Sequence, residues 1–271
     1  NVRYSPTEKI GLRASYSSGY RAPQAYNEDL HIDALDNKVA IIRLAPDLKP
    51  EYSHSLSASV DLYHNFGRVQ ANLLVEGFYT MLEDVFTLEK IGEDAQGNII
   101  KERRNASGAT VAGVGAEAKA GIPGRFELQL GYTFQRSRYD EPEKWSDDVT
   151  PQRRIFRSPD HYGYLTVNVN LTRDFTASVF GNYTGRMLVQ HNAGYIERDT
   201  ERLTPDFWDM GLRLSYNFRL TKQLRLELNA GVKNLFDSFQ KDLDFGQNKD
   251  AAYIYGPAVP RTYFIGAKFA L

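Results

Sequence analysis

The sequence contains no cysteine and no apolar run long enough for a transmembrane helix. The absence of cysteine excludes disulfide frameworks and cysteine-based catalysis. The absence of long apolar runs excludes helical membrane spans. A closed β-sheet is then the only structure with which this chain could cross a bilayer, because lipid tolerates only elements that satisfy their own backbone hydrogen bonds.

The sequence also lacks an excess of charge and any recognisable catalytic motif. Its 33 Lys and Arg residues balance 34 Asp and Glu residues, so no basic field indicates a nucleic-acid partner. There is no Gly-x-Ser-x-Gly elbow, phosphate-binding loop or His-Glu-x-x-His motif. The five histidines and the loop acids do not follow the spacing of metal sites. We therefore expect no enzyme, no cofactor and no bound metal.

Alternation with a period of two is the strongest pattern that is present. Residues 224–233 carry apolar side chains at the even positions, and the odd positions hold charged residues, an amide and a glycine. Residues 261–271 repeat the alternation up to the end of the chain. This pattern predicts strands with one apolar and one polar face. Aromatic residues at the ends of the apolar faces predict the interface girdles of a membrane-spanning sheet: Tyr16, Tyr79, Tyr132, Tyr183, Tyr216, Tyr263 and Phe269.

The same unit recurs along the chain and predicts about eleven strands. Short turns follow residues 4, 63, 121, 171 and 219, and longer loops follow residues 20, 90, 139, 190 and 240. Residues 91–104 are expected to form one of these loops, and residues 175–190 a single strand. Because short and long connections alternate, all long loops lie at one end. The predicted fold is all-β, a transmembrane antiparallel up-and-down β-barrel with periplasmic turns and extracellular loops.

The strand count predicts that part of the barrel is missing. Single-chain bacterial barrels have an even number of strands and start in the periplasm, whereas this chain starts within a strand. We interpret it as the C-terminal half of a larger barrel, or as a product nicked in an extracellular loop.

Three motifs resemble those of a known family. Gly-Val-Lys-Asn-Leu-Phe-Asp at residues 231–237 and the Pro-Arg-Thr-Tyr entry to the last strand at 260–263 resemble the end of a TonB-dependent outer-membrane receptor. Tyr-Ser-Ser-Gly-Tyr-Arg-Ala-Pro-Gln at residues 16–24 is similar to a mid-barrel strand of that family. The resemblance covers residues 1–271 as the second half of a 22-stranded barrel. The chain departs from the family by ending in Ala270 and Leu271 rather than in an aromatic residue.

The resemblance implies uptake of a scarce nutrient across the outer membrane of a Gram-negative bacterium. The expected ligand is an iron chelate (siderophore) or cobalamin, and a glycan is the alternative within the family. The implied partners are the TonB complex, the receptor's own plug domain, outer-membrane lipid and lipopolysaccharide, and a surface lipoprotein. The plug domain and the N-terminal strands are not in this sequence. Residues 24–31 resemble receptors of Bacteroidetes-type bacteria.

Two groups of residues are candidates for the functional site. Loop aromatics could stack on a ligand, arginines could pair with an anionic chelate, and loop histidines could ligate haem: Tyr26, His31, Arg138, Arg186, His191, Tyr195, Tyr253 and Tyr255. The arginines could equally contact lipopolysaccharide or stay solvated. Inward polar residues could contact a plug or line a solvated lumen: Glu76, Glu117, Lys119, Arg213, Arg225 and Glu227.

Two other functions remain open. A complete, smaller barrel could be a passive porin, in which case residues 21–50 would form a constriction loop. It could also be a surface hydrolase that uses loop acids and His191 for acid–base chemistry. Both readings require an open or catalytic lumen instead of a plug.

Overall fold

The computed structural model describes residues 1–23, 41–95, 99–257 and 259–270. Its main element is one antiparallel sheet with the strand order β1-β2-β4-β5-β8-β9-β11-β12-β15-β16-β17, to which β10 adds by pairing with β9. The strands are β1 (Val2–Thr7), β2 (Ile10–Arg21), β4 (Glu51–Phe66), β5 (Val69–Glu83), β8 (Ala109–Ile122), β9 (Phe126–Glu143), β10 (Gln152–Arg154), β11 (His161–Asn170), β12 (Phe175–Thr184), β15 (Phe207–Arg219), β16 (Arg225–Lys233) and β17 (Thr262–Ala270).

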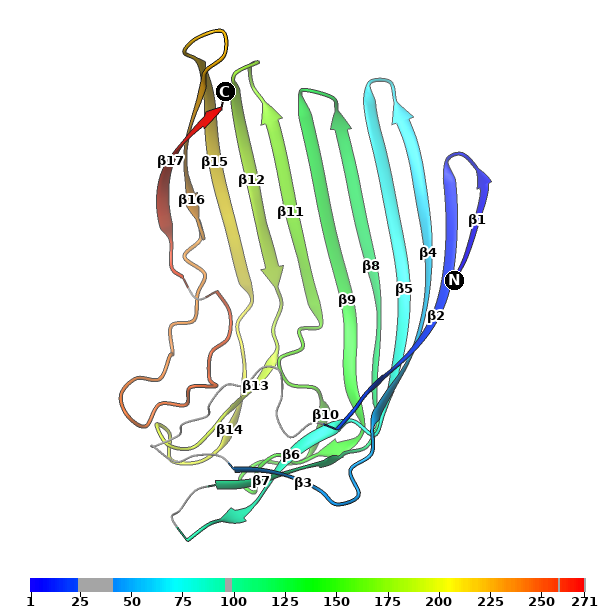
Figure 1. Ribbon diagram of the computed structural model, residues 1–271, viewed down its shortest axis with the longest axis vertical. Helices are drawn as coiled ribbons and strands as arrows, with labels where there is room; N and C mark the ends of the chain where they lie inside the picture. The colour runs from blue at the N-terminus through cyan, green and yellow to red at the C-terminus, as the bar shows by residue number, and fades with distance from the viewer. Residues whose placement is uncertain (24–40, 96–98, 258, 271) are drawn as a thin grey trace.

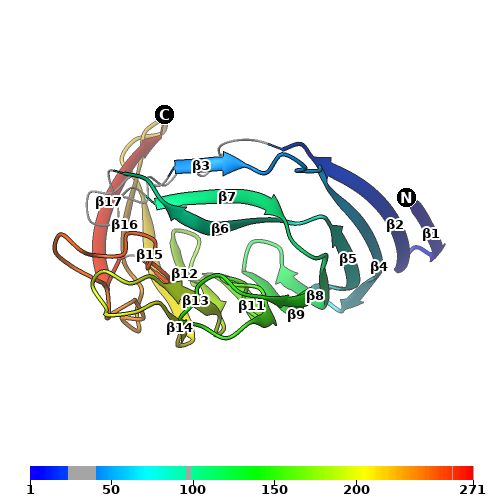
Figure 2. The same ribbon diagram turned by 90° about the horizontal axis from the view of Figure 1, so that it is seen from below.

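This sheet curves into a trough, with all short turns at one end and all long connections at the other (Figure 1). Viewed from the long-loop end, it forms a C-shaped wall with β1 and β17 at its two edges (Figure 2). The predicted all-β, antiparallel barrel wall and the predicted sorting of connections are confirmed. Positive φ angles at Gly67 (63°) and Gly124 (72°) make two of the tight turns, where a side chain at Cβ would be strained.

The register keeps polar residues on the concave face and apolar residues on the convex face. Leu165 of β11 pairs with Leu130 of β9, and the next residue, Thr166, pairs with Gln129. Leu130 is 47 % exposed. A row of large exposed apolar side chains on the outside of a curved sheet matches a lipid-facing wall.

Aromatic residues border this apolar band, as the sequence predicts. At the long-loop end, the rings of Tyr183 and Trp208 lie 4.4 Å apart between centroids. Nearby, the Tyr132 hydroxyl shares a hydrogen bond of 2.7 Å with His161 Nδ1. Rings with one polar atom suit the boundary between lipid and headgroups, so this belt marks the level of the membrane surface.

Concave-face aromatics lie over glycines of the neighbouring strand. The Phe180 ring of β12 covers Gly211 of β15, where an added Cβ would come within 2.6 Å of the ring. The Tyr164 ring covers Gly131 in the same way. Because glycine has no side chain, the aromatic ring can pack directly against its backbone. This packing stabilises the strand at the glycine position.

The long connections contain strands that the sequence reading missed. Residues 91–104 were predicted as a loop, but β6 (Phe86–Glu93) and β7 (Ile99–Asn105) form a hairpin that β3 (Ile41–Leu44) joins in parallel. The predicted strand 175–190 ends at Thr184, and β13 (Leu188–His191) pairs instead with β14 (Thr200–Leu203). Loop backbone that packs needs hydrogen-bond partners, and these small sheets provide them. The β3-β7-β6 sheet extends across the concave side of the trough (Figure 2).

No helix in the part of the chain that the structure describes is long and apolar enough to span a membrane.

Candidate functional site: the polar trough and its outer loops

The concave face of the trough is mostly polar, and a few apolar side chains such as Leu74, Phe78 and Phe180 lie among the polar ones. All six residues predicted to face the lumen lie on it: Glu76, Glu117, Lys119, Arg213, Arg225 and Glu227. Lys119 forms an ion pair with Glu117, which also accepts a hydrogen bond from the Tyr164 hydroxyl. Arg213 forms an ion pair with Glu227 on the adjacent strand. Contact of these residues with a plug stays a prediction.

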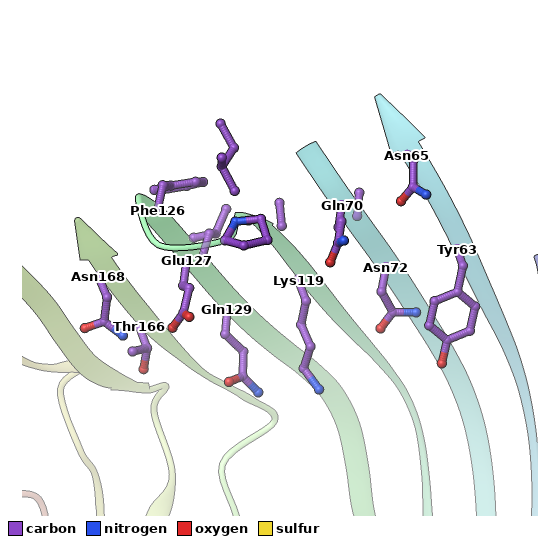
Figure 3. A pocket seen from close by; sticks show the side chains of 16 residues that line it. Tyr63, Asn65, Gln70, Asn72, Lys119, Phe126, Glu127, Gln129, Thr166 and Asn168 are labelled. Atoms are coloured by element: carbon purple, nitrogen blue, oxygen red, sulfur yellow. The ribbon is translucent and has the colours of Figure 1, made fainter. Parts of the chain in front are cut away.

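A hollow of about 580 Å³ opens on this face near the short-turn end (Figure 3). Its wall combines apolar residues, among them Ile122, Phe126 and Leu128, with the following polar ones: Tyr63, Asn65, Gln70, Asn72, Lys119, Glu127, Gln129, Thr166 and Asn168. The Lys119 side chain is 50 % exposed despite its ion pair. Elsewhere on the concave face, the Arg213 side chain is 43 % exposed despite its ion pair with Glu227. The wall therefore presents donors and acceptors that another polar surface could satisfy.

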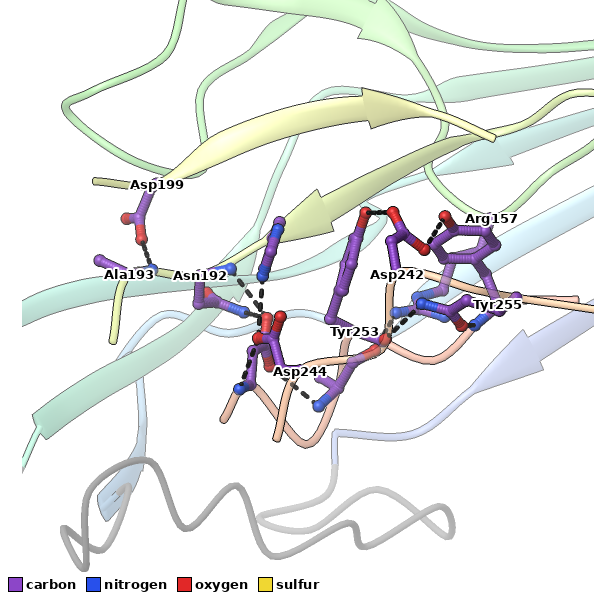
Figure 4. Close-up of polar contacts among 12 residues, drawn as sticks. Arg157, Asn192, Ala193, Asp199, Asp242, Asp244, Tyr253 and Tyr255 are labelled. Carbon is purple, nitrogen blue, oxygen red and sulfur yellow. Dashed lines mark hydrogen bonds and ion pairs between the residues drawn. The ribbon is translucent and has the colours of Figure 1, made fainter. Parts of the chain in front are cut away.

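At the long-loop end, two connections share a small buried core. Val189 of β13, Phe207 at the start of β15, Tyr253 and Tyr255 are all less than a tenth exposed and contact one another. Met187 packs against them. The segment 240–255 is thus held against the β13-β14 hairpin (Figure 4). Burial of these apolar groups gives the loops a fixed arrangement.

A polar network surrounds this core. His191 Nε2 lies 2.9 Å from Asp244 Oδ2, and the two side chains are 4 % and 2 % exposed. The His191 ring stacks on the Tyr253 ring, with centroids 3.6 Å apart and an interplanar angle of 4°. Gln240 clamps the backbone on both sides, because its Nε2 donates to Tyr253 O and its Oε1 accepts from Tyr255 N.

Asp242 joins the two tyrosines of the core. Its carboxylate accepts hydrogen bonds from the hydroxyls of Tyr253 (2.9 Å) and Tyr255 (2.5 Å). Burial raises the pKa of Tyr253 to about 12, and burial together with Asp242 raises the pKa of Tyr255 further. Burial also acts to raise the pKa of Asp242, but its hydrogen bonds, first those from the two hydroxyls, together outweigh burial and lower that pKa below its ordinary value. All three groups therefore keep one protonation state at neutral pH.

The structure separates the residues predicted to bind a substrate. His191, Tyr253 and Tyr255 come together, but their rings are buried against each other and have no face open to a ligand. Tyr195 is 43 % exposed and packs edge-on against Phe245, so it can reach a ligand. Substrate binding by these residues stays a prediction. Tyr26 and His31 lie outside the described residues.

The two predicted arginines do not lie in the lumen. Arg138 belongs to the outward face of β9, because it alternates with Ser137 and continues the row of Phe134 and Arg136. Arg186 Nε lies 3.7 Å from Asp206 Oδ2. Asp206 also accepts a hydrogen bond from the hydroxyl of the outward-facing Tyr183. Arg138 thus lies on the outer wall, away from the trough, and its predicted contact with a ligand stays a prediction.

Sequence reasoning missed the acids and amides that hold the outer loops. Asp242, Asp244 and Asp250 each bond a different part of the β13-β14 hairpin or of their own loop. The spacing Asp-Leu-Asp at residues 242–244 was an available signal, because alternate residues of an extended segment share a face. Within the described ranges, no three acidic or histidine side chains come close enough to hold a metal ion.

A curved wall with a lipid-facing outside, an aromatic border and a mostly polar inside is typical of an outer-membrane β-barrel. The family profile described as TonB dependent receptor-like, beta-barrel matches residues 1–235. The chain belongs to this family, and it resides in the outer membrane of a Gram-negative bacterium.

Solved structures show the same fold. The ferric-catecholate import receptor Fiu from Escherichia coli K12 superposes with a TM-score of 0.64 at 21 % identity, over 99 % of this chain and 34 % of that receptor. The ferripyoverdine receptor of Pseudomonas aeruginosa gives 0.65 at 16 %, over 99 % and 32 %. The copper transporter OprC gives 0.64 at 16 %, over 99 % and 38 %. The chain thus spans about a third of the length of these proteins. A sequence comparison with curated proteins gives no match.

Proposed function

We propose that this chain forms part of the wall and outer mouth of a receptor that takes up a metal chelate with energy from the TonB complex. The observation that carries the proposal is the polar concave face, where the side chains of Lys119 and Arg213 stay 50 % and 43 % exposed although each already has an acidic partner. A wall of this kind suits contact with a polar plug domain, whose position would be set by these donors. In this proposal the N-terminal strands complete the barrel wall, and the plug domain fills the lumen.

The chelate is the finer part of the proposal. Two of the similar structures are named as siderophore-type receptors and one as a copper transporter, which favours a metal-bearing ligand over cobalamin or a glycan. On our chain, Tyr195 with Phe245 is the exposed aromatic pair at the mouth. Such a pair could stack on a planar ligand group. We propose transport rather than catalysis, with a surface lipoprotein as a candidate partner at the mouth.

Uptake by a deletion strain tests this function. The gene is deleted in its native host and restored on a plasmid, and uptake of iron-55 from a panel of ferric siderophores is followed under iron limitation. We expect uptake of at least one chelate to need both the gene and TonB, and to stop when a protonophore dissipates the proton gradient. Uptake that is unchanged by the deletion would contradict the chelate, and cobalt-57 cobalamin and glycan growth assays would then identify the other ligand classes.

Conductance distinguishes the porin alternative. The native-length protein is purified from outer membranes and inserted into planar bilayers. A plugged receptor gives no stable open channel, whereas a passive porin conducts continuously. Steady conductance that survives without TonB would therefore overturn the proposal of energised uptake.

A further inference from the structure

Every short turn of the wall carries an exposed basic residue. The turns lie together at one end of the sheet (Figure 1), which is the periplasmic end in barrels of this kind. Within the described ranges, the side chains of these residues form no ion pair and no hydrogen bond. Glu8 and Asp174 are each adjacent in sequence to one of them. The basic residues are Lys9, Arg68, Arg125, Arg173 and Lys222.

Acidic residues are missing from three of these turns. Residues 62–75, 118–126 and 210–226 contain no Asp or Glu, and they hold the β4-β5, β8-β9 and β15-β16 turns. At the base of the β15-β16 turn, Arg219 also pairs in register with Arg225. Like charges directly opposite each other destabilise a sheet unless an anion compensates for them. These three turns therefore form a periplasmic end with a clear positive excess.

Exposed apolar side chains indicate the depth of these charges in the membrane. Phe66 continues the convex row of β4, is 65 % exposed and precedes Arg68 by two residues. Leu220 continues the convex row of β15, is 51 % exposed and precedes Lys222 by two residues. The lipid-facing rows thus end just before the basic side chains. Since hydrocarbon gives way to headgroups where such rows end, the charges lie at the headgroup level.

The three charged turns are spread along the rim of the wall. The β4-β5 and β8-β9 turns are neighbours in the sheet, and the β15-β16 turn lies two hairpins further along. Adjacent strands are about 4.8 Å apart, so neighbouring hairpins are about 10 Å apart. A folded protein partner covers one compact patch, whereas a lipid leaflet surrounds the wall and meets every turn. The distribution of the charges therefore favours lipid.

We propose that Arg68, Arg125 and Lys222, which we call the basic collar, bind the phosphate headgroups of anionic phospholipids in the periplasmic leaflet of the outer membrane. Phosphate oxygens form charge-assisted hydrogen bonds with guanidinium and ammonium groups, and anionic lipids attract basic residues close to the membrane surface. These contacts hold the short-turn end of the wall at the level of that leaflet. The inference is independent of the proposed ligand and plug, because it needs only the wall and its orientation.

The test measures which lipids stay bound to the native-length protein. The protein is placed in nanodiscs of equal parts phosphatidylglycerol and phosphatidylethanolamine with identical acyl chains, and native mass spectrometry counts the lipids retained after release. R68Q/R125Q/K222Q removes the charges of the collar, each single substitution removes one, and R68K/R125K/K222R keeps all three. R198Q/R202Q/K249Q is the matched control, because these exposed residues lie in the long connections at the opposite end. Heat-dependent gel mobility establishes that each variant is folded.

We expect the wild type to retain about fivefold more phosphatidylglycerol than phosphatidylethanolamine, because one basic residue at an anionic surface favours it by about that factor. R68Q/R125Q/K222Q should retain the two lipids equally, and each single substitution should remove part of the preference. The charge-keeping variant and the control should match the wild type. No preference in the wild type, or the same preference in R68Q/R125Q/K222Q, would overturn the proposal.

Two further measurements distinguish other sources of negative charge. Soluble sn-glycerol 3-phosphate should leave the preference for phosphatidylglycerol unchanged, and its loss at equimolar glycerol phosphate would overturn the lipid as the source of the phosphate. Binding to isolated peptidoglycan sacculi should be the same for wild type and R68Q/R125Q/K222Q. Weaker sacculus binding by that variant, with its lipid preference intact, would overturn the proposal in favour of the cell wall.

Discussion

His191 holds the last long connection through two interactions that substitution can separate. Its Nε2 forms a hydrogen bond of 2.9 Å with Asp244 Oδ2, and its ring stacks on the Tyr253 ring with 3.6 Å between the ring centroids. Phenylalanine at this position keeps a ring for the stack but removes the donor to Asp244. The other ring nitrogen, Nδ1, has no partner among the described residues, so no second hydrogen bond is lost. Asp244→Asn removes the charge of the acceptor, and the double variant closes a thermodynamic cycle.

The magnitude follows from the burial of the pair. Both side chains are almost completely buried, so water does not replace the lost bond. A hydrogen bond to a charged group contributes about 1.5–3 kcal/mol, which corresponds to about 10- to 150-fold in the equilibrium for loop opening. The cycle isolates this coupling from the extra apolar surface of phenylalanine and from the bond that Asp250 N donates to Asp244.

Hydrogen exchange of residues 188–203 and 240–255 measures the opening in detergent micelles. The exchange of β11 is the internal control, because opening of the outer loops leaves the barrel wall paired. We expect faster exchange in both single variants and less than additive effects in the double variant. A coupling below ~0.5 kcal/mol would lie within the error of additivity. It would refute the conclusion that His191 and Asp244 hold the two connections together.

Three further predictions concern the loops and the two faces of the wall. Burial raises the pKa of Tyr253 to about 12. The contribution of the protonated Tyr253 side chain to loop stability is therefore complete below the unfolded pKa of about 10 and is lost as pH rises to about 12. The tyrosinate absorbance of wild type minus Y253F measures this titration, and a rise near pH 10 would contradict the burial of the ring. Val167→Lys on the convex face should lower the stability of the folded barrel by about 2–4 kcal/mol and reduce its assembly, whereas Thr166→Lys on the concave face should be tolerated. Heat-modifiable gel mobility measures the folded fraction, and equal mobility of the two variants would contradict the assignment of the faces. Gly211→Ala should lower the denaturation temperature, because the new methyl group meets the Phe180 ring. Adding Phe180→Ala to the same chain should remove the loss in denaturation temperature that Gly211→Ala causes. If this loss remained in the double variant, the methyl group would be meeting backbone and not the ring.

Much of the barrel wall could be predicted from local pattern. Alternation at residues 224–233 specifies a strand and assigns each side chain to a face, because successive residues of a strand point in opposite directions. The same rule placed Glu117 and Arg213 on the concave face from the sequence alone. The strands β6 and β7 were missed because residues 91–104 include turn formers and carry no clear alternation.

The candidate site was only partly predictable. Loop aromatics were expected to be exposed, yet Tyr253 and Tyr255 are buried, because a segment distant in sequence supplies Val189 and Phe207 as packing partners. Arg138 was assigned to a ligand from its position near a loop, but its place in the alternation of β9 puts it on the outer wall. Extending the period-two rule through residues 136–138 would have found this from the sequence.

The sequence by itself determined the strands, their two faces, the sorting of short and long connections, and the family. These features depend on neighbours within a few residues, where sterics and hydrophobicity act directly. Only the tertiary structure decided that His191 meets Asp244 and that Arg154 meets Arg138. Those contacts depend on how loops fold against each other and on strand register, and long-range packing sets both without any local signal.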